Sequence, residues 1–222
     1  MAEPSLRIEW GVSNVPHPDK GDGDGEDTWF VINDAQSPAA GVFDGVGAWQ
    51  EDGINPIFWS VAVAEGCSAA VMDGMMGPIK ILSEGYRAAQ QSNHEGSCTA
   101  CIAIKNGPRS IAVANLGDSA IALYRDDELI FETQQQEYMF NYPYALSSEK
   151  DATPADADRK LLTKLKSGDI LLVAGKGHEK TQDIGNKKIF FSDRKVILSA
   201  IKNKKNNLSN NLKLNVGKEA AQ

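Results

Sequence analysis

The chain has 222 residues, which is enough for one domain with a sizeable core, or for one domain and an appendage. Charged residues make up 24% and hydrophobic residues 41% of the sequence, as is usual for a water-soluble globular protein. The sequence has no run of about 18 apolar residues, and MAEPSLRIEW lacks both the basic and the apolar part of a signal peptide. We therefore expect a cytoplasmic protein without a membrane partner.

Charge is distributed unevenly along the chain. Residues 1–174 contain 12 Lys and Arg residues against 26 Asp and Glu residues, whereas residues 175–222 contain 11 against 4. The final stretch, KNKKNNLSNNLKLNVGKEAAQ, has too few apolar side chains to bury a core of its own. We expect residues 1–174 to form the main domain, and residues 175–222 to end in a basic, partly disordered tail.

The first elements predicted along the chain are short strands. Turn-forming residues in PHPDKGDGDGED and NDAQSP separate three apolar or alternating runs. The predicted strands are SLRIEWGV (5–12), DTWFVI (27–32) and AAGVFDG (39–45).

Helices follow these strands. The apolar spacing between Pro56 and Gln91 predicts two helices, joined near residues 74–78. Four apolar runs, GSCTACIAI, RSIAVANLG, SAIALYR and ELIFETQ, then predict an antiparallel meander. Residues 154–166 predict a short helix, and SGDILLVAG predicts a buried strand. The fold class expected is α+β, with helices covering antiparallel sheets.

The stretch GVFDGVGAW places Asp44 at the end of an apolar strand and Gly45 directly after it. A carboxylate there is costly unless it is paired or binds a cation, and Gly45 lets a backbone carbonyl approach an ion. Upstream, Glu26 and Asp27 are adjacent, so they would point to opposite faces of a strand. Such oxygen donors suit Mg²⁺ or Mn²⁺. In the alternative interpretation Asp44 caps a turn and the other two are solvated, and spacing alone does not decide between them.

The three cysteines are Cys67, Cys98 and Cys101. A zinc site would need a second close pair or well-spaced histidines, which the sequence lacks. A redox pair in CTAC would need a helix after the first cysteine, but this run predicts a strand, whose side chains at these two positions face opposite sides. The sequence therefore favours small buried side chains.

Four motifs in order, GEDTWFV, GVFDGVGAW, GSCTACIAI and VANLGDSAIALYR, resemble metal-dependent Ser/Thr protein phosphatases of type 2C (PPM-type), in the branch with DGVGGW. The resemblance covers residues 7–174 and implies a β-sandwich flanked by helices. It implies that Glu26, Asp44 and the carbonyl of Gly45 hold one metal, with Asp44 bridging to a second. It further implies that Asp27 positions a metal-bound water and that Asp118 lies near another ion.

The sequence departs from this family after the strand GDILLVA. The family has a D-G-x-x-D segment there and a D-N motif near the C-terminus, and the chain has neither. Val46 also stands where many relatives have a histidine. The resemblance therefore implies an incomplete phosphatase domain whose later metal ligands are missing.

The segment that takes their place, LLVAGKGHEKTQDIGNKKIFFSDRKVI, is similar to the C-terminal end of Mur ligases of the UDP-N-acetylmuramoyl-tripeptide synthetase type. The similarity spans residues 171–200, and in such ligases the residues matching Gly175 and Glu179 help to bind the incoming amino acid. The ligases' P-loop and central domain are absent from the sequence, which argues against ligase activity. We interpret the chain as a chimera, with a partial phosphatase domain in residues 1–174 and a short αβ segment in residues 175–222.

Two functions stay open at this point. The first is a metal-dependent serine/threonine phosphatase that acts on phosphoproteins, impaired by the missing ligands, with no nucleic-acid partner. The second is a non-catalytic phosphatase-like protein that binds phosphoprotein or partner chains. They differ in whether a tail carboxylate, such as Glu179, Asp183 or Asp193, completes a second metal site within about 2.0–2.6 Å of the ion.

Overall fold

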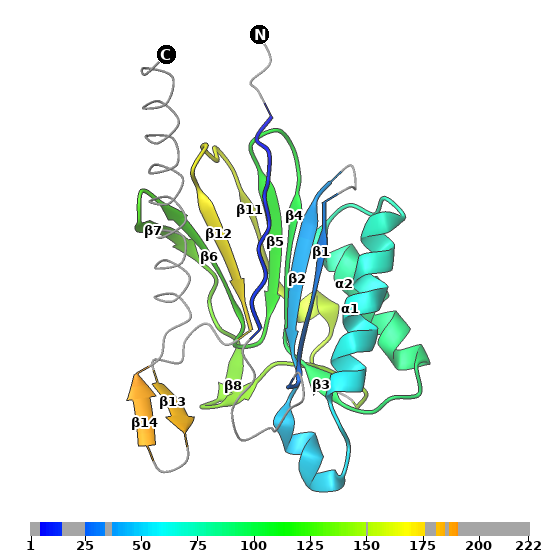
Figure 1. Ribbon diagram of the computed structural model, residues 1–222. Coiled ribbons are helices and arrows are strands. Elements are labelled where there is room, and N and C mark those ends of the chain that lie inside the picture. Colours follow the sequence, from blue (N-terminus) through cyan, green and yellow to red (C-terminus); the bar gives the residue numbers. More distant parts are fainter. Residues whose placement is uncertain are drawn as a thin grey trace, which may run out of the picture. The chain divides into compact units, whose positions relative to one another are not determined.

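The computed structural model describes residues 5–14, 25–33, 37–149, 151–175, 181–184 and 187–190 (Figure 1). The chain divides into two compact units, Met1–His178 and Glu179–Gln222. In the described part of the chain, no helix is long and apolar enough to cross a membrane.

The larger sheet of the first unit has five strands in the order β1-β2-β4-β5-β11, and every neighbouring pair is antiparallel. Its strands are β1 (Asp27–Ile32), β2 (Ala39–Asp44), β4 (Ala100–Lys105), β5 (Ile111–Leu116) and β11 (Asp158–Leu162). Strand β5 is buried along its whole length and β4 nearly so, which explains why both are almost continuously apolar rather than alternating.

A second sheet has the order β12-β6-β7, again antiparallel, with β12 (Ile170–Ala174), β6 (Ala120–Arg125) and β7 (Glu128–Glu132). One buried cluster contains Cys101 and Val113 from the larger sheet together with Ile121 and Leu123 from the second, and the partly buried Val173 packs against it. The two sheets therefore pack face to face, and this confirms the predicted sandwich.

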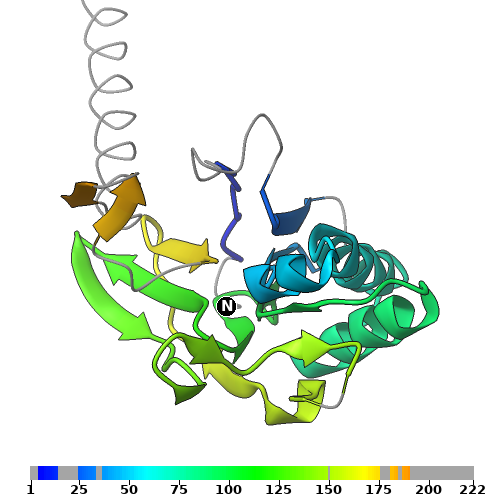
Figure 2. The same cartoon turned by 90° about the horizontal axis from the view of Figure 1, so that it is seen from below.

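Two helices, α1 (Ile57–Met72) and α2 (Pro78–Gln91), cover the other face of the larger sheet (Figures 1 and 2). The cluster beneath them includes Trp59, Ile81 and Leu82 from the helices, and Phe43 and Ile102 from the sheet. The two helices pack closely against each other at Gly85.

A Cβ added at Gly85 would lie 2.3 Å from Cys67 Sγ and 2.6 Å from the carbonyl oxygen of Val63. Only glycine fits at this contact between α1 and α2.

Short elements complete the first unit: η2 (Gly47–Asp52), β3 (Ser97–Cys98), β8 (Glu137–Met139), β9 (Tyr142–Pro143), β10 (Leu146–Ser147) and η3 (Pro154–Asp156). Strand β3 pairs with β10, and β8 pairs with β9. In the second unit, β13 (Thr181–Ile184) and β14 (Lys187–Phe190) form an antiparallel hairpin.

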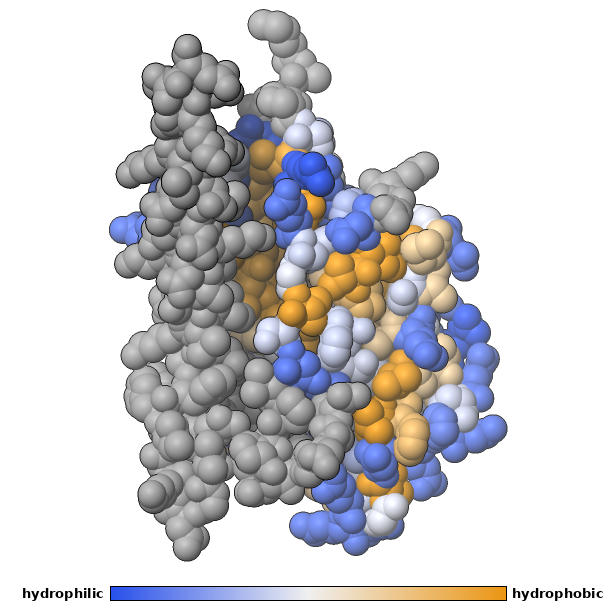
Figure 3. Space-filling model, in the orientation of Figure 1, coloured by the Kyte–Doolittle hydropathy of each residue, from blue (hydrophilic) through white to orange (hydrophobic). Residues whose placement is uncertain are grey.

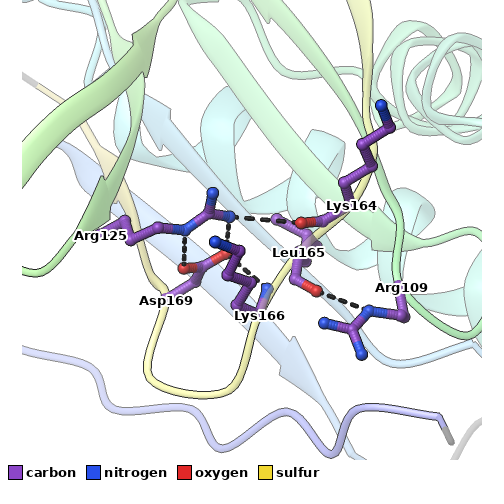
Figure 4. A network of polar contacts seen from close by, with 6 residues as sticks. All are labelled: Arg109, Arg125, Lys164, Leu165, Lys166 and Asp169. Atoms are coloured by element: carbon purple, nitrogen blue, oxygen red, sulfur yellow. Dashed lines mark hydrogen bonds and ion pairs between the residues drawn. The ribbon is translucent and has the colours of Figure 1, made fainter.

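An ion pair between Arg125 and Asp169 stabilises the start of β12. Arg125 at the end of β6 donates from Nε and Nη2 to the two carboxylate oxygens of Asp169, at 2.8 and 2.7 Å (Figure 4). Asp169 also accepts a bond from the backbone N–H of Lys166, and Arg125 reaches the carbonyl of Lys164 at 3.3 Å. This network holds the turn between β11 and β12.

Most of the predicted elements are confirmed, among them the strands at 27–32 and 39–44, both helices and the strand in GDILLVA. The helix predicted over 154–166 is wrong, because only Pro154–Asp156 form a helical turn and Asp158–Leu162 pair with β5 as a strand. Thr153 and Asp156 cap the start of this turn, but the pairing of Asp158–Leu162 with β5 outweighs the helical apolar spacing of KLLTKLK.

The strand predicted over 5–12 is also wrong. These residues lie outside any strand, although the N–H of Leu6 donates to the carbonyl of Pro108 at 2.8 Å and Leu6 and Ile8 pack against the sandwich core. The predicted meander is divided, because β4 and β5 pair in one sheet and β6 and β7 in the other. The helical part of the αβ segment predicted in residues 175–222 and the predicted disordered tail lie outside the described residues.

Candidate metal centre

Asp27 and Asp44 lie directly opposite each other, at the start of β1 and the end of β2. The N–H of Gly45 donates to the carbonyl of Glu26 at 3.2 Å, so Asp27 and Asp44 form a non-hydrogen-bonded pair of the ladder. In such pairs the two side chains are on the same face of the sheet and close together. Two carboxylates in this position repel each other unless a cation lies between them or nearby.

The chain leaves β2 through a constrained turn at Gly45. The carbonyl of Asp44 accepts from the N–H of Thr99, and the N–H of Val46 donates to the carbonyl of Ser97, both at 2.9 Å. These two bonds flank the bridge between Gly45 and Cys98, so this pairing does not use the carbonyl of Gly45. A Cβ at Gly45 would lie 2.8 Å from the carbonyl oxygen of Glu26, so the close approach requires glycine.

Glu26 is 5% exposed and its side chain points away from Asp27. Its carboxylate lies against Gly47, where an added Cβ would be 3.2 and 3.3 Å from the two oxygens. The amide of Gln50 donates to the carboxylate, and Ser60 Oγ donates to the Glu26 carbonyl at 3.0 Å. The opposite orientations of Glu26 and Asp27 agree with the prediction that adjacent residues of a strand point to opposite faces of the sheet. Our sequence analysis did not identify Gln50 or Ser60, because no motif singles them out.

The end of β12 reaches the same place. A Cβ added at Gly175 would lie 3.6 Å from Asp27 Oδ1 and 3.6 Å from Asp44 Cβ. The residue directly after GDILLVA is therefore a neighbour of both carboxylates, although it brings no ligand of its own. The motif GDILLVA predicts strand β12, but the contact of Gly175 with Asp27 and Asp44 depends on the pairing of β12 with β6.

Asp118 lies in the turn between β5 and β6 and is 4% exposed. Its carbonyl accepts from the side-chain amide of Gln135 at 3.2 Å. The next residue, Ser119, shares a 2.5 Å hydrogen bond with Thr99 Oγ1, and Thr99 donates its N–H to Asp44. The backbones that carry Asp118 and Asp44 are thus joined through Thr99.

The donors present suit a hard cation. Among the residues that the structure describes, no three Asp, Glu, His or Cys side chains gather into a complete metal-binding set. Asp27 and Asp44 nevertheless supply paired carboxylates beside the carbonyl of Gly45. Mg²⁺ is commonly held by one or two carboxylates with water completing its shell, so this donor set fits such an ion.

The three cysteines are buried and none forms a disulfide. Burial, as the largest cause, raises the pKa of Cys67, Cys98 and Cys101. Cys98 belongs to the core under the helices and Cys101 to the core between the sheets, as expected for a strand. Burial disfavours the charged thiolates, in agreement with the prediction that the cysteines are small buried side chains.

No protein-family model matches the chain. The chain is 31% identical over 177 residues to "Probable protein phosphatase 2C 80" of Arabidopsis thaliana, and 32% identical over 167 residues to "Protein phosphatase PTC7 homolog fig" of Drosophila grimshawi. The solved structure of the photosystem II phosphatase PBCP superimposes with a TM-score of 0.69 at 30% identity. The chain is therefore homologous to type 2C protein phosphatases.

These similarities are partial. They cover 78%, 69% and 76% of this chain, respectively. The chain spans only 41% and 54% of the two curated relatives, and 66% of the PBCP chain.

Proposed function

We propose that this protein is a metal-dependent serine/threonine phosphatase of type 2C. The observation that carries the proposal is the pair formed by Asp27 and Asp44, two carboxylates opposed on one face beside the turn at Gly45. Homology to protein phosphatases supports the same activity.

In this proposal Asp44 and the carbonyl of Gly45 would hold Mg²⁺ or Mn²⁺, and Asp118 would lie near a further ion. Glu26 would join the first ion by turning its carboxylate away from Gly47. Asp27 would accept a hydrogen bond from the attacking water, orient it and help to keep it beside the ion, so that Asp27 also contributes to metal affinity. When bound, such a cation activates water and neutralises charge on the phosphoryl group. In the structure Gln50 holds the Glu26 carboxylate beside Gly47, and Ser60 fixes the backbone of Glu26.

The substrate proposed is a phosphoserine or phosphothreonine of another protein. Asp27 and Asp44 are only partly buried, so a phosphorylated side chain can reach them from solvent. The names of the relatives, which are protein phosphatases, support a phosphoprotein rather than a small phosphate ester.

The test is release of inorganic phosphate from a phosphothreonine peptide with and without Mn²⁺. We expect release only with the metal, and a loss of at least about a hundredfold in Asp44→Asn. Asp73→Asn, which removes an exposed charge at the end of α1, is the matched control and should keep full activity. Metal-independent release, or equal rates in both variants, would overturn the proposal.

A non-catalytic binding protein is the second candidate. Among the described residues, no group of three Asp, Glu, His or Cys side chains could hold a metal ion, and this favours the second candidate. In that case the folded protein would bind Mn²⁺ and a phosphothreonine peptide through Asp44 but release no phosphate.

The division of the chain is also a proposal. We propose a partial phosphatase domain in residues 1–174 and a Mur-ligase-like segment from residue 175. The change in charge at this point and the AGKGHE pattern support it. Of the tail carboxylates named in the sequence analysis, Asp183 lies in β13, and Glu179 and Asp193 lie outside the described residues.

A further inference from the structure

A groove of about 420 Å³ lies where the N-terminal end of α2 meets the edge strand β11. Ile79 and Ala112 contribute to its apolar lining, and Met76 and Leu161 form part of its walls. Met76 is 43% exposed and Leu161 is 49% exposed, so the walls are open to solvent. A pocket for a small molecule would bury most of its ligand, so this groove is better suited to one part of a larger partner.

Three cations line the groove: Lys80 from α2, and Arg159 and Lys160 from β11. All three are exposed, and within the described residues none has an ion-pair partner. They stand out because residues 1–174 carry a net charge of −14, from 12 Lys and Arg residues and 26 Asp and Glu residues. The groove is therefore a basic site on an acidic domain.

Charged residues on an edge strand can also serve to prevent unwanted strand pairing. That role explains Arg159 and Lys160 but not Lys80, which comes from a helix. It also does not explain the hollow lined by Met76 and Leu161, because blocking an edge needs charge and not an apolar surface. Exposed methionine is instead typical of surfaces that adapt to bound peptides.

A further exposed apolar side chain lies close to the groove in the sequence. Met72, at the end of α1, is 63% exposed, and only a short connection separates it from Met76. Apolar patches are mixed with polar side chains over the front face of the first unit (Figure 3). Apolar surface in such a mixture is unremarkable by itself, and the basic rim is what distinguishes the groove.

The groove is remote from the candidate metal centre. Thr99, directly before β4, bonds to Asp44, whereas Asn106, directly after β4, lines the groove. The six residues of β4 span about 20 Å. A partner in the groove would therefore not touch the residues proposed for catalysis.

We propose that this groove docks an acidic peptide segment of a partner protein that carries one or two apolar anchor residues. The anchor packs against Met76 and Leu161, and the flanking carboxylates meet Lys80, Arg159 and Lys160. The free edge of β11 adds backbone hydrogen bonds when the peptide is extended. The basic tail of this chain is a poor occupant, because it carries charge of the same sign.

The test measures binding of the fluorescein-labelled peptide EEDLFEDE to the full chain by fluorescence anisotropy. We expect saturable binding that weakens with added salt, because the contacting charges are exposed. The double variant Lys80→Glu/Arg159→Glu should bind at least about tenfold more weakly. The control double variant Arg7→Glu/Arg87→Glu changes net charge by the same amount outside the groove and should bind like the wild type.

Two further peptides separate charge from anchoring. QQNLFQNQ lacks the acids and EEDSSEDE lacks the apolar anchors, and both should bind at least about tenfold more weakly than EEDLFEDE. Absence of binding by the wild-type chain, or equal weakening in the two double variants, would overturn the proposal. Binding of phosphatidylserine vesicles through Lys80 and Arg159, without binding of the peptide, would overturn it in favour of a lipid surface. None of these readouts depends on phosphatase activity.

Discussion

Asp27 and Asp44 face each other across the β1–β2 ladder, and the backbone bond from Gly45 to Glu26 fixes them as a close, non-hydrogen-bonded pair. Two like charges held in this way weaken a sheet in the absence of a counterion. In the proposed function a bound cation would offset this repulsion, which links the local geometry of β2 to the proposed chemistry.

Gly175 offers a direct way to strengthen the centre. An added Cβ would make ordinary contacts, at 3.6 Å, with Asp27 and Asp44, so a side chain fits there without displacing either. Gly175→Asp adds a third carboxylate, and we expect it to raise Mn²⁺ affinity about tenfold, measured by titration calorimetry. Gly175→Ala, the control, should bind Mn²⁺ like the wild type. An unchanged affinity in Gly175→Asp would contradict the placement of this residue beside the centre.

Asp169 should stabilise the second sheet in a pH-dependent way. Burial opposes its ionisation, but hydrogen bonds from Arg125 and the N–H of Lys166 outweigh burial and lower the pKa of Asp169. A lowered folded-state pKa gives stability that is present above the unfolded pKa of about 3.9, and that is lost as pH falls through the folded value.

Asp169→Asn is therefore expected to lower the free energy of unfolding by about 1–2 kcal/mol at pH 7. The difference from wild type should shrink below about pH 4, as measured by urea denaturation at several pH values. A difference independent of pH would show that the carboxylate charge is not responsible.

Cysteine reactivity reports on the core. Because burial raises the pKa of Cys67, Cys98 and Cys101, we expect negligible alkylation by iodoacetamide at pH 8 in the native protein. Alkylation of all three should become fast in 6 M urea, followed by mass spectrometry. Rapid labelling of Cys98 or Cys101 in the native state would contradict the burial of the CTAC run.

The contact between the two helices should be intolerant of extra volume. Gly85→Ala improves helix propensity, yet its methyl group would meet Cys67 and the backbone at Val63. We expect a net loss of about 1–3 kcal/mol in the free energy of unfolding, measured by thermal denaturation. Gly11→Ala, where an added Cβ meets nothing within 4 Å, should change it by less than about 0.5 kcal/mol. A neutral Gly85→Ala variant would show that the helices can separate freely.

Much of the fold could be predicted from local pattern, but pairing partners could not. Strands β1, β2 and β12 and both helices follow from apolar spacing and turn residues. The sequence KLLTKLK has helical spacing, and only the free edge of β5 makes residues 158–162 a strand. In the same way, SLRIEWGV alternates like a strand but has no partner in either sheet.

The candidate site could likewise be predicted only in part, because the sequence does not show which distant segments pack together. Asp44, Gly45 and the opposite orientations of Glu26 and Asp27 follow from residues that are close in sequence. The neighbours of these residues do not: Gln50, Ser60 and Gly175 come from a 3-10 helix, an α-helix and a distant strand. Their contacts depend on tertiary packing, which no short motif encodes.

Mn²⁺ binding, followed by electron paramagnetic resonance during titration of the full chain, tests the central claim most directly. If Asp27 and Asp44 form a metal centre, the wild type binds Mn²⁺ saturably, and Asp27→Asn and Asp44→Asn each weaken binding at least about tenfold. The control Asp73→Asn should match the wild type. Wild-type affinity in both Asp27→Asn and Asp44→Asn would contradict the account.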